Sequence, residues 1–264
     1  MNNLWFFFGV IFMLICSCEK VIDIPLDVAD ERLVVEAVIK DSPGNNYILL
    51  SKSGSVYGGS DLEKVEDAIV TVTDEDGVVF DFPHQEDGLY NSPIFQVVPG
   101  KRYDLQVSAL GRVITASCQT RSKPHLDSLT YLPITGAFGV PVGDTIHLVS
   151  FHSVDDVDEK KFYWVKIFRN RKENSGYYLG NDDFVNGQYY EAQFFGSEAD
   201  PRDTVFVEMI SMDEANYDYF IGLANNLSSG PFAAAPANPP SNLEGDAIGF
   251  FGAYTTDTLS LILP

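Results

Sequence analysis

Residues 68–82, AIVTVTDEDGVVFDF, carry the pattern that decides the fold. Ala68–Thr73 is a run of alanine and β-branched residues, and β-branched residues favour extended strands. Asp76-Gly77 follows, and this dipeptide is a strong signal for a two-residue turn between antiparallel strands. Val78–Phe82 then supplies the return strand. The stretch therefore predicts a β-hairpin.

The segments on both sides of this hairpin carry the same kind of pattern. Short apolar runs are separated by turn signals such as Pro99-Gly100 and Gly111. Short strands with turns at intervals of about 8–12 residues are typical of β-sandwiches. We therefore expect an N-terminal Ig-like or prealbumin-like β-sandwich over residues 30–121. Its further strands are Arg32–Lys40, Tyr47–Ser51, Tyr103–Leu110 and Val113–Thr120.

A second β-rich domain is expected over residues 122–264, after the linker Arg121–Pro124. Aromatic and β-branched residues mark its strands. The predicted strands are Leu129–Pro133, Thr145–His152, Phe162–Arg169, Gln188–Phe195, Thr204–Met212, Ala247–Tyr254 and Thr258–Leu263.

One helix is predicted inside this second domain. Ser211 and Glu214 fit a capping box, in which each side chain bonds the other residue's backbone N–H. Phe220, Leu223 and Leu227 then follow at helical spacing, with a glycine just beyond them. The predicted fold class is therefore mainly β, with two β-rich domains and one helix.

The chain begins with a hydrophobic leader. Leu4–Ser17 is nearly all apolar, but it is shorter than the roughly 20 residues of a transmembrane helix and suits a secretory signal. Ile15–Cys18 then resembles a lipobox, although the first three residues include no Lys or Arg. We expect residues 1–17 to be a signal peptide, Cys18 to carry acyl groups such as palmitate, and residues 18–29 to form a tether. An uncleaved hydrophobic anchor is the alternative.

The formal net charge is -21, and no charged side chain lies in residues 1–18. An acidic surface repels phosphate backbones and anionic lipid headgroups. We therefore expect no nucleic-acid partner, and a membrane attachment that comes only from the acyl groups on Cys18. Solubility explains the acidity, with cation binding as the alternative. Cys16 and Cys18 fall at the predicted cleavage site, and Cys118 is the one cysteine in the body of the chain, so we expect a buried packing thiol and no internal disulfide.

No catalytic or metal-binding motif stands out. The acidic runs Asp155–Glu159 and Asp182-Asp183 lack EF-hand spacing, so solvated loops are expected, with Ca²⁺ binding as the alternative. There is no GxSxG, no phosphate-binding loop and no GxGxxG after a strand. We therefore predict no catalytic residue, no metal and no cofactor. The four histidines form no zinc pattern either: His84, His125, His147 and His152.

Two further patterns have a functional and a structural interpretation. The aromatic segments Phe162–Trp164 and Tyr189-Tyr190 could stack sugar rings, but core packing is expected. Four tripeptides resemble the O-glycosylation acceptor of exported Bacteroidetes proteins, although turn chemistry at the start of a strand explains them equally well. They are Asp127-Ser128-Leu129, Asp144-Thr145-Ile146, Asp203-Thr204-Val205 and Asp257-Thr258-Leu259.

Several of these segments together resemble the DUF4249 family of Bacteroidetes outer-membrane lipoproteins. They are CSCEKVIDI (16–24), RLVVEAVI (32–39), FVNGQYYEAQFF (184–195), MDEANYDYFIGL (212–223) and PPSNLEGDAIGFFGAY (239–254). The last is the most specific, and Asp246 departs from it, because a small residue is expected there. Its motif residues are Asn242, Gly245, Gly249, Phe250, Phe251, Gly252 and Tyr254.

The motif segment is expected to be structural. Glycine inside a strand marks a bulge or a close backbone approach. Phe250 and Phe251 should point to opposite faces, with at least one buried in the core of the second domain. A binding edge is the alternative.

Three functions remain open at this level. The resemblance implies an outer-membrane lipoprotein whose genes often lie near those of TonB-dependent receptors. We therefore expect a non-enzymatic binding or accessory component that works with such a receptor or in surface assembly. The alternatives are a glycan-active enzyme, which needs two carboxylates across a cleft, and a structural or adhesive surface module.

Overall fold

The computed structural model describes residues 31–42, 46–54, 62–136, 140–155, 159–174, 176–194, 198–227 and 237–264. The described part is mainly β, with one α-helix, which confirms the predicted fold class. No helix in this part is long and apolar enough to cross a membrane. The predicted signal peptide, the lipidation residue Cys18 and the tether lie outside the described residues.

Every predicted strand has an observed counterpart, with bounds shifted by a few residues at most ends. In chain order the elements are β1 (Leu33–Lys40), β2 (Tyr47–Lys52), β3 (Ile69–Asp74), β4 (Val79–Asp81), β5 (Leu89–Tyr90), β6 (Arg102–Ala109), β7 (Arg112–Gln119), β8 (Leu126–Thr135), β9 (Thr145–Val154), β10 (Phe162–Arg169), β11 (Lys172–Glu173), β12 (Tyr178–Asn181), β13 (Tyr189–Gln193), β14 (Thr204–Met212), α2 (Glu214–Leu227), β15 (Leu243–Glu244) and β16 (Ala247–Ile262).

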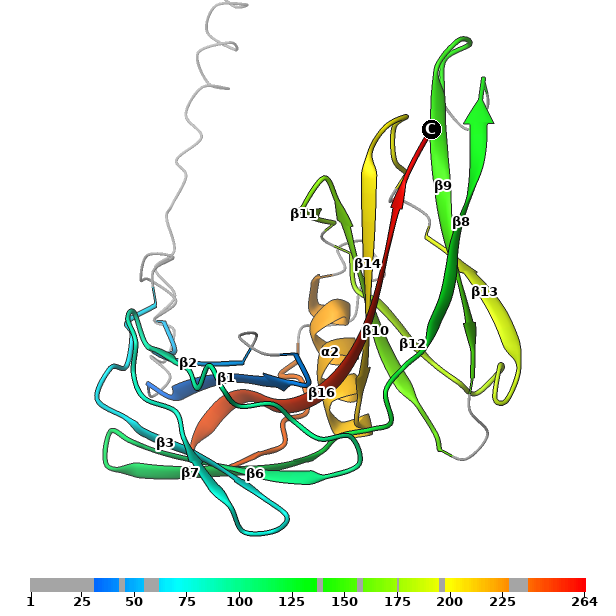
Figure 1. Cartoon of the computed structure of the whole chain (residues 1–264). Helices are drawn as coiled ribbons and strands as arrows, with labels where there is room; N and C mark the ends of the chain where they lie inside the picture. Colours follow the sequence, from blue (N-terminus) through cyan, green and yellow to red (C-terminus); the bar gives the residue numbers. More distant parts are fainter. Residues whose placement is uncertain are drawn as a thin grey trace, which may run out of the picture.

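One long strand, β16, organises the fold. It lies in an eight-stranded sheet of order β11-β10-β14-β16-β1-β2-β5, with β12 beside β10. Residues 247–254 pair with β1 in parallel, and residues 255–262 pair with β14 antiparallel. In Figure 1, β16 (red) runs from the layer of β1 up along β14. It therefore takes part in both halves of the chain, on either side of the predicted boundary between residues 121 and 122.

The two predicted closing strands are in fact one strand, so that division is wrong. No turn forms at residues 255–257. The Thr256 N–H and hydroxyl both donate to Asp41 Oδ1, at 3.0 and 2.9 Å. The Thr255 hydroxyl donates to the carbonyl of Ser122 at 3.0 Å. These bonds satisfy the polar groups of the two threonines and keep the chain extended.

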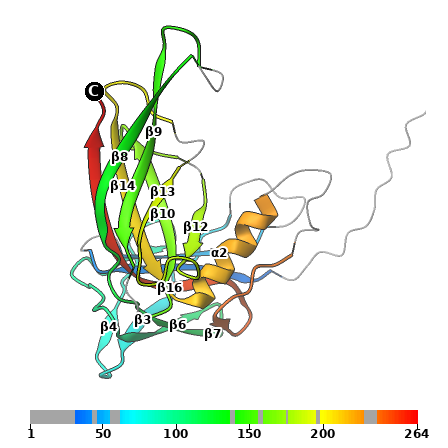
Figure 2. The same cartoon turned by 90° about the vertical axis from the view of Figure 1, so that its right-hand side faces the viewer.

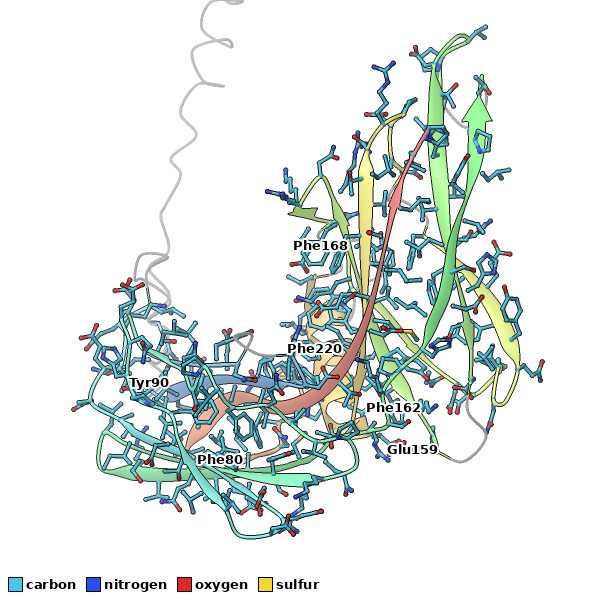
Figure 3. The ribbon with its side chains drawn as sticks, viewed as in Figure 1. Phe80, Tyr90, Glu159, Phe162, Phe168 and Phe220 are labelled. Atoms are coloured by element: carbon cyan, nitrogen blue, oxygen red, sulfur yellow. The ribbon has the colours of Figure 1, made fainter. Side chains whose placement is uncertain are left out.

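The N-terminal half is a β-sandwich. Its second sheet has the order β15-β7-β6-β3-β4 and contains the predicted hairpin, in which β3 pairs with β4. Alternate residues of β1 and β16, such as Val35 and Phe251, share one core with residues of this sheet, such as Leu105. Figure 3 shows the side chains of Phe80 and Tyr90 in this half.

The C-terminal half is built in a similar way on the same face of the eight-stranded sheet. A three-stranded sheet of order β13-β9-β8 packs against β10 and β14, with Phe151, Val165 and Val207 in the shared core. Leu259 and Leu261 of β16 pack against this core. Because side chains alternate along a strand, the odd-numbered residues of β16 serve both cores in turn.

The opposite face of the eight-stranded sheet carries the helix. Helix α2 contacts β10, β12 and β16, and Figure 2 shows it (orange) next to β10 and β12. Phe220 of α2 is buried with Phe162, Ile210 and Phe250 in a third cluster. Figure 3 shows Phe220 on the helix.

The start of α2 differs from the predicted capping box. Ser211 belongs to β14, where it pairs with Thr255, and its buried hydroxyl has no hydrogen-bond partner among the described residues. Asp213 caps the helix instead: its Oδ1 accepts the N–H of Asn216 at 3.0 Å. The prediction was wrong because β14 continues through Met212, so the cap comes from the first residue after the strand.

Candidate functional site

Even-numbered residues of β1, β10, β14 and β16 point to the helix-bearing face. Helix α2 covers part of this face, and a pocket of about 300 Å³ lies beside it. We call it the aromatic pocket. It is lined by Glu36, Val38, Lys40, Tyr47, Trp164, Lys166, Tyr177, Ile210, Tyr219, Phe220, Leu223, Phe250 and Tyr254.

The rings of the aromatic pocket support one another. Trp164 and Tyr177 are stacked, with centroids 5.4 Å apart and an interplanar angle of 20°. Trp164 also lies 4.7 Å from Phe220. Phe250 lies 5.0 Å from Phe220 and 4.9 Å from Tyr219. Aromatic pairs at such separations stabilise their arrangement beyond the burial of their surface, so the walls are preformed.

Two of the three charged side chains that line the pocket are neutralised by ion pairs. Lys40 Nζ lies 2.8 Å from Glu208 Oε1, and both side chains are largely buried. Lys166 Nζ lies 3.2 Å from Glu173 Oε1. Glu36 is half-buried and has no ion pair or hydrogen bond within the described part of the chain. Among the described residues, nothing therefore balances the charge of the Glu36 carboxylate.

The negative charge of Glu36 contributes to the raised pKa values of three tyrosines of the pocket. Burial raises the pKa of Tyr47, and the charge of Glu36 raises it further. Burial and then Glu36 also raise the pKa of Tyr219. The pKa of Tyr177 is raised by burial, by Glu173 and by Glu36, in that order. All three phenols stay protonated at neutral pH, so they can donate hydrogen bonds to a ligand.

The end of the pocket near Tyr254 adjoins a buried polar network. The Tyr254 hydroxyl donates to Asn216 Oδ1 at 2.9 Å. Asn216 Nδ2 donates to Asp213 Oδ1 at 2.8 Å. The Cys118 thiol donates to Asp213 Oδ2 at 3.2 Å, and its sulfur accepts the N–H of Ala253 at 3.1 Å. The network joins β7, α2 and β16.

Cys118 is a buried, free thiol, as predicted. Burial raises the pKa of this thiol well above its usual value, and the negative charge of Asp213 adds to the effect. The reactive form of cysteine is the thiolate. Cys118 therefore acts as a hydrogen-bonding residue of the network, and its environment opposes nucleophilic chemistry.

Three motif residues, Asn242, Gly245 and Gly249, allow residues 242–254 to pack closely against β1 and β7. The Asn242 amide binds both backbone groups of Phe251: Oδ1 accepts its N–H at 3.0 Å and Nδ2 donates to its carbonyl at 2.7 Å. Gly249 has φ +118°, and a Cβ there would collide with the carbonyl oxygen of Val35. Gly245 has φ +112°, and a Cβ there would lie 2.8 Å from Ile114.

The other motif residues fill both faces of β16. Phe250 and Phe251 are both buried and point to opposite faces, as predicted. Phe250 packs with residues of the second half, whereas Phe251 belongs to the core of the N-terminal sandwich. The ring of Tyr254 occupies the space that a side chain at Gly252 would need. Phe250 and Tyr254 thus bring the motif to the aromatic pocket.

Asp246 stands where a small residue was expected, and two arginines lie near its carboxylate. Its carboxylate lies 3.1 Å from Arg112 Nη1 and 4.0 Å from Arg32 Nε. The side chain is exposed, so it remains hydrated.

The histidines lie apart from the pocket. His147 is buried against the ring of Tyr131, and His152 Nε2 lies 2.8 Å from the Thr130 hydroxyl. His84 contacts the Tyr90 ring, and His125 is exposed. Within the described ranges, no group of three or more His, Cys, Asp or Glu side chains could hold a metal ion.

Two residues of the acidic runs are buried, so the prediction of solvated loops is wrong for them. Asp155 accepts the Tyr163 hydroxyl at 3.2 Å and the Gly187 N–H at 3.1 Å. Asp182 accepts the Lys161 N–H at 2.9 Å. Both carboxylates satisfy donors of neighbouring segments. Residues 156–158 lie outside the described part.

The aromatic segments include both buried and exposed residues, and the tripeptides lie at different positions in their strands. Phe162 and Tyr163 are buried, as expected, while Trp164 lines the pocket. Tyr189 is exposed and stacks on His152. Thr204 and Thr145 start β14 and β9, but Thr258 lies inside β16, so a strand start does not explain that tripeptide.

Sequence reasoning missed most of the pocket, including Glu36, Lys40, Tyr177 and Tyr219. One signal was present: Glu36 interrupts the otherwise apolar run Leu33–Ile39. A charge in such a strand has to face either solvent or a partner.

Two comparisons with known proteins bear on the family of this chain. A search of curated proteins gives no match. A family described as "Domain of unknown function (DUF4249)" matches residues 19–260. The match includes nearly all of the described strands and the helix. The chain therefore belongs to the DUF4249 family.

Proposed function

We propose that this chain is an outer-membrane lipoprotein, anchored through acyl groups on Cys18, that binds a small ligand in the aromatic pocket. It would work as an accessory component of a TonB-dependent receptor or of another envelope assembly. The aromatic pocket carries the binding role. Small-molecule sites are typically concave, mostly apolar and about 300–1,000 Å³ in volume, with a few polar groups that orient the ligand. The lipobox and the family resemblance support the location.

Within the aromatic pocket, the charges favour binding over glycan hydrolysis. Glycosidases need two carboxylates on opposite sides of the bond that they cut. Glu36 is the one acidic residue among those that line the aromatic pocket. A single carboxylate can orient a ligand without supplying an acid and base pair.

The binding role can be tested on protein purified from its native membranes. Native mass spectrometry should detect a bound small molecule on the wild-type chain and not on Trp164→Leu, which removes one wall. Tyr131→Leu is the matched control, because Tyr131 is an exposed aromatic residue of β8 outside the pocket. Equal occupancy of all three proteins, or none in the wild type, would refute a ligand site in this pocket.

The anchoring can be tested by metabolic labelling with a fatty-acid analogue. Cys18→Ala should abolish labelling and leave a longer precursor, while the matched variant Cys16→Ala should retain the label. If the proposed partnership holds, a receptor should co-purify with the labelled wild type. Equal labelling of Cys18→Ala and wild type would contradict the anchor.

A further inference from the structure

The arrangement of charge and rings in the aromatic pocket indicates the class of ligand. Glu36 lies directly opposite Phe250 in the pairing of β1 with β16, and Val38, two residues on, lies opposite Tyr47 of β2. Tyr219 of α2 lies against Phe250, with centroids 4.9 Å apart. A carboxylate is thus flanked by rings that come from three separate elements.

Aromatic rings attract cations because their faces carry partial negative charge. The pocket already shows this attraction, since Lys166 Nζ lies 4.3 Å from the centroid of the Trp164 ring. That lysine is neutralised by Glu173. Lys40 is likewise neutralised by Glu208. A cation near Glu36 would therefore meet no unpaired positive charge from either lysine.

The half-buried carboxylate of Glu36 lacks a counterion within the described residues. Removing a charge from water is unfavourable unless a partner compensates for the lost hydration. A ligand cation would be that partner for the carboxylate. The aromatic rings around the cation would replace the water that the cation loses on binding. The electrostatic influence of Glu36 on Tyr47, Tyr177 and Tyr219 shows that these side chains share its environment.

We propose that the aromatic pocket binds a small organic cation of the alkylammonium class, with Glu36 as the counterion and the rings of Tyr47, Tyr219 and Phe250 around the charged group. This inference rests on the proposed function, because it names the ligand class of the same pocket. The formal net charge of -21 would help to draw such a ligand to the protein.

Isothermal titration calorimetry of the full chain tests this with tetramethylammonium, choline, propylammonium and 3,3-dimethyl-1-butanol, the neutral isostere of choline. At least one ammonium probe should bind, and choline should bind at least about tenfold more tightly than its isostere. Glu36→Gln should weaken ammonium binding at least about tenfold and leave the isostere unchanged. Glu191→Gln is the control, because it removes an exposed carboxylate on β13.

Several outcomes would overturn the inference. They are the absence of binding by all three ammonium probes, equal affinity for choline and its isostere, and an effect of Glu36→Gln no larger than that of Glu191→Gln. A neutral molecule found in the pocket by native mass spectrometry would also overturn it, yet would leave the proposed binding function intact. If native mass spectrometry finds no ligand whose binding depends on Trp164, the proposed binding function itself is refuted.

Discussion

At the scale of single residues, the position of α2 depends on one buried polar network around Asn216. Asn216 is almost fully buried, and its amide group bonds Asp213, Tyr254 and the backbone carbonyl of Phe251. Unpaired, such a group would cost about 1–3 kcal/mol of stability. The network therefore fixes the position of α2 against β16, and with it one end of the aromatic pocket.

The first prediction concerns Cys118 and alkaline pH. Burial, followed by the charge of Asp213, raises the pKa of the folded thiol well above the unfolded value of 9.0. The stabilisation is thus complete below about pH 9 and is lost as pH rises, because the unfolded chain releases a proton that the folded chain keeps. We expect the unfolding free energy to fall by up to about 1.4 kcal/mol per pH unit from this one group.

Urea unfolding between pH 8 and 10.5 measures this loss. Cys118→Ser is the comparison, because serine keeps a donor and an acceptor but does not titrate in this range. The tyrosines whose pKa values are raised are present in both proteins, so most of their contribution cancels in the difference between the two curves. Tyr254 is the exception: burial raises its pKa first and the charge of Cys118 raises it next, so its contribution to the difference has the same sign as that of the thiol. Parallel curves would contradict the prediction.

At the scale of elements, β16 requires glycine where its backbone approaches β1. Gly249 has φ +118°, and a Cβ at this position would meet the backbone of Val35. We expect Gly249→Ala to lower the unfolding free energy by more than about 3 kcal/mol, because the backbone strain of alanine at positive φ adds to the collision of its Cβ with Val35. Gly180→Ala is the matched control, because nothing lies within 4 Å of a Cβ on this strand glycine. It should change stability by less than about 1 kcal/mol in denaturant titrations, and similar losses for both variants would refute the assignment.

The start of helix α2 gives a second prediction at this scale. Asp213→Ala should cost about 1–3 kcal/mol, because it removes the cap of α2 and the acceptor of the Cys118 thiol. Ser211→Ala should be neutral or slightly stabilising, since it removes a buried hydroxyl that has no partner among the described residues. Thermal unfolding of both variants distinguishes the two caps. A larger loss for Ser211→Ala would restore the capping box that the sequence suggests.

At the scale of the whole molecule, local signals predicted the elements but not their partners. Phe162–Arg169 and Thr204–Met212 were predicted with their observed bounds, because aromatic and β-branched runs of this length carry a strong signal. Tyr178–Asn181 was missed, since it is short and contains glycine and asparagine. The parallel pairing of β1 with β16 joins the two ends of the described chain, and periodicity reports which face a residue occupies but not which strand lies beside it. The aromatic pocket was missed for the same reason, because its lining comes from five strands, one helix and Tyr177.

The last prediction follows from the path of β16 through both halves. Phe251 is fully buried in the N-terminal sandwich, so Phe251→Ala should cost about 3–5 kcal/mol. The same strand continues into its pairing with β14 through residues 255–262, within one eight-stranded sheet, so opening the N-terminal half removes support from the strand that borders β14. We therefore expect a single cooperative unfolding transition, and faster amide exchange in β14 as well as in β1 for Phe251→Ala. Val79→Ala, on an exposed position of β4, is the control and should leave exchange unchanged in both strands. If Phe251→Ala speeds exchange in β1 but not in β14, the halves unfold independently, and the division of the chain near residue 121 is an energetic boundary despite the shared strand.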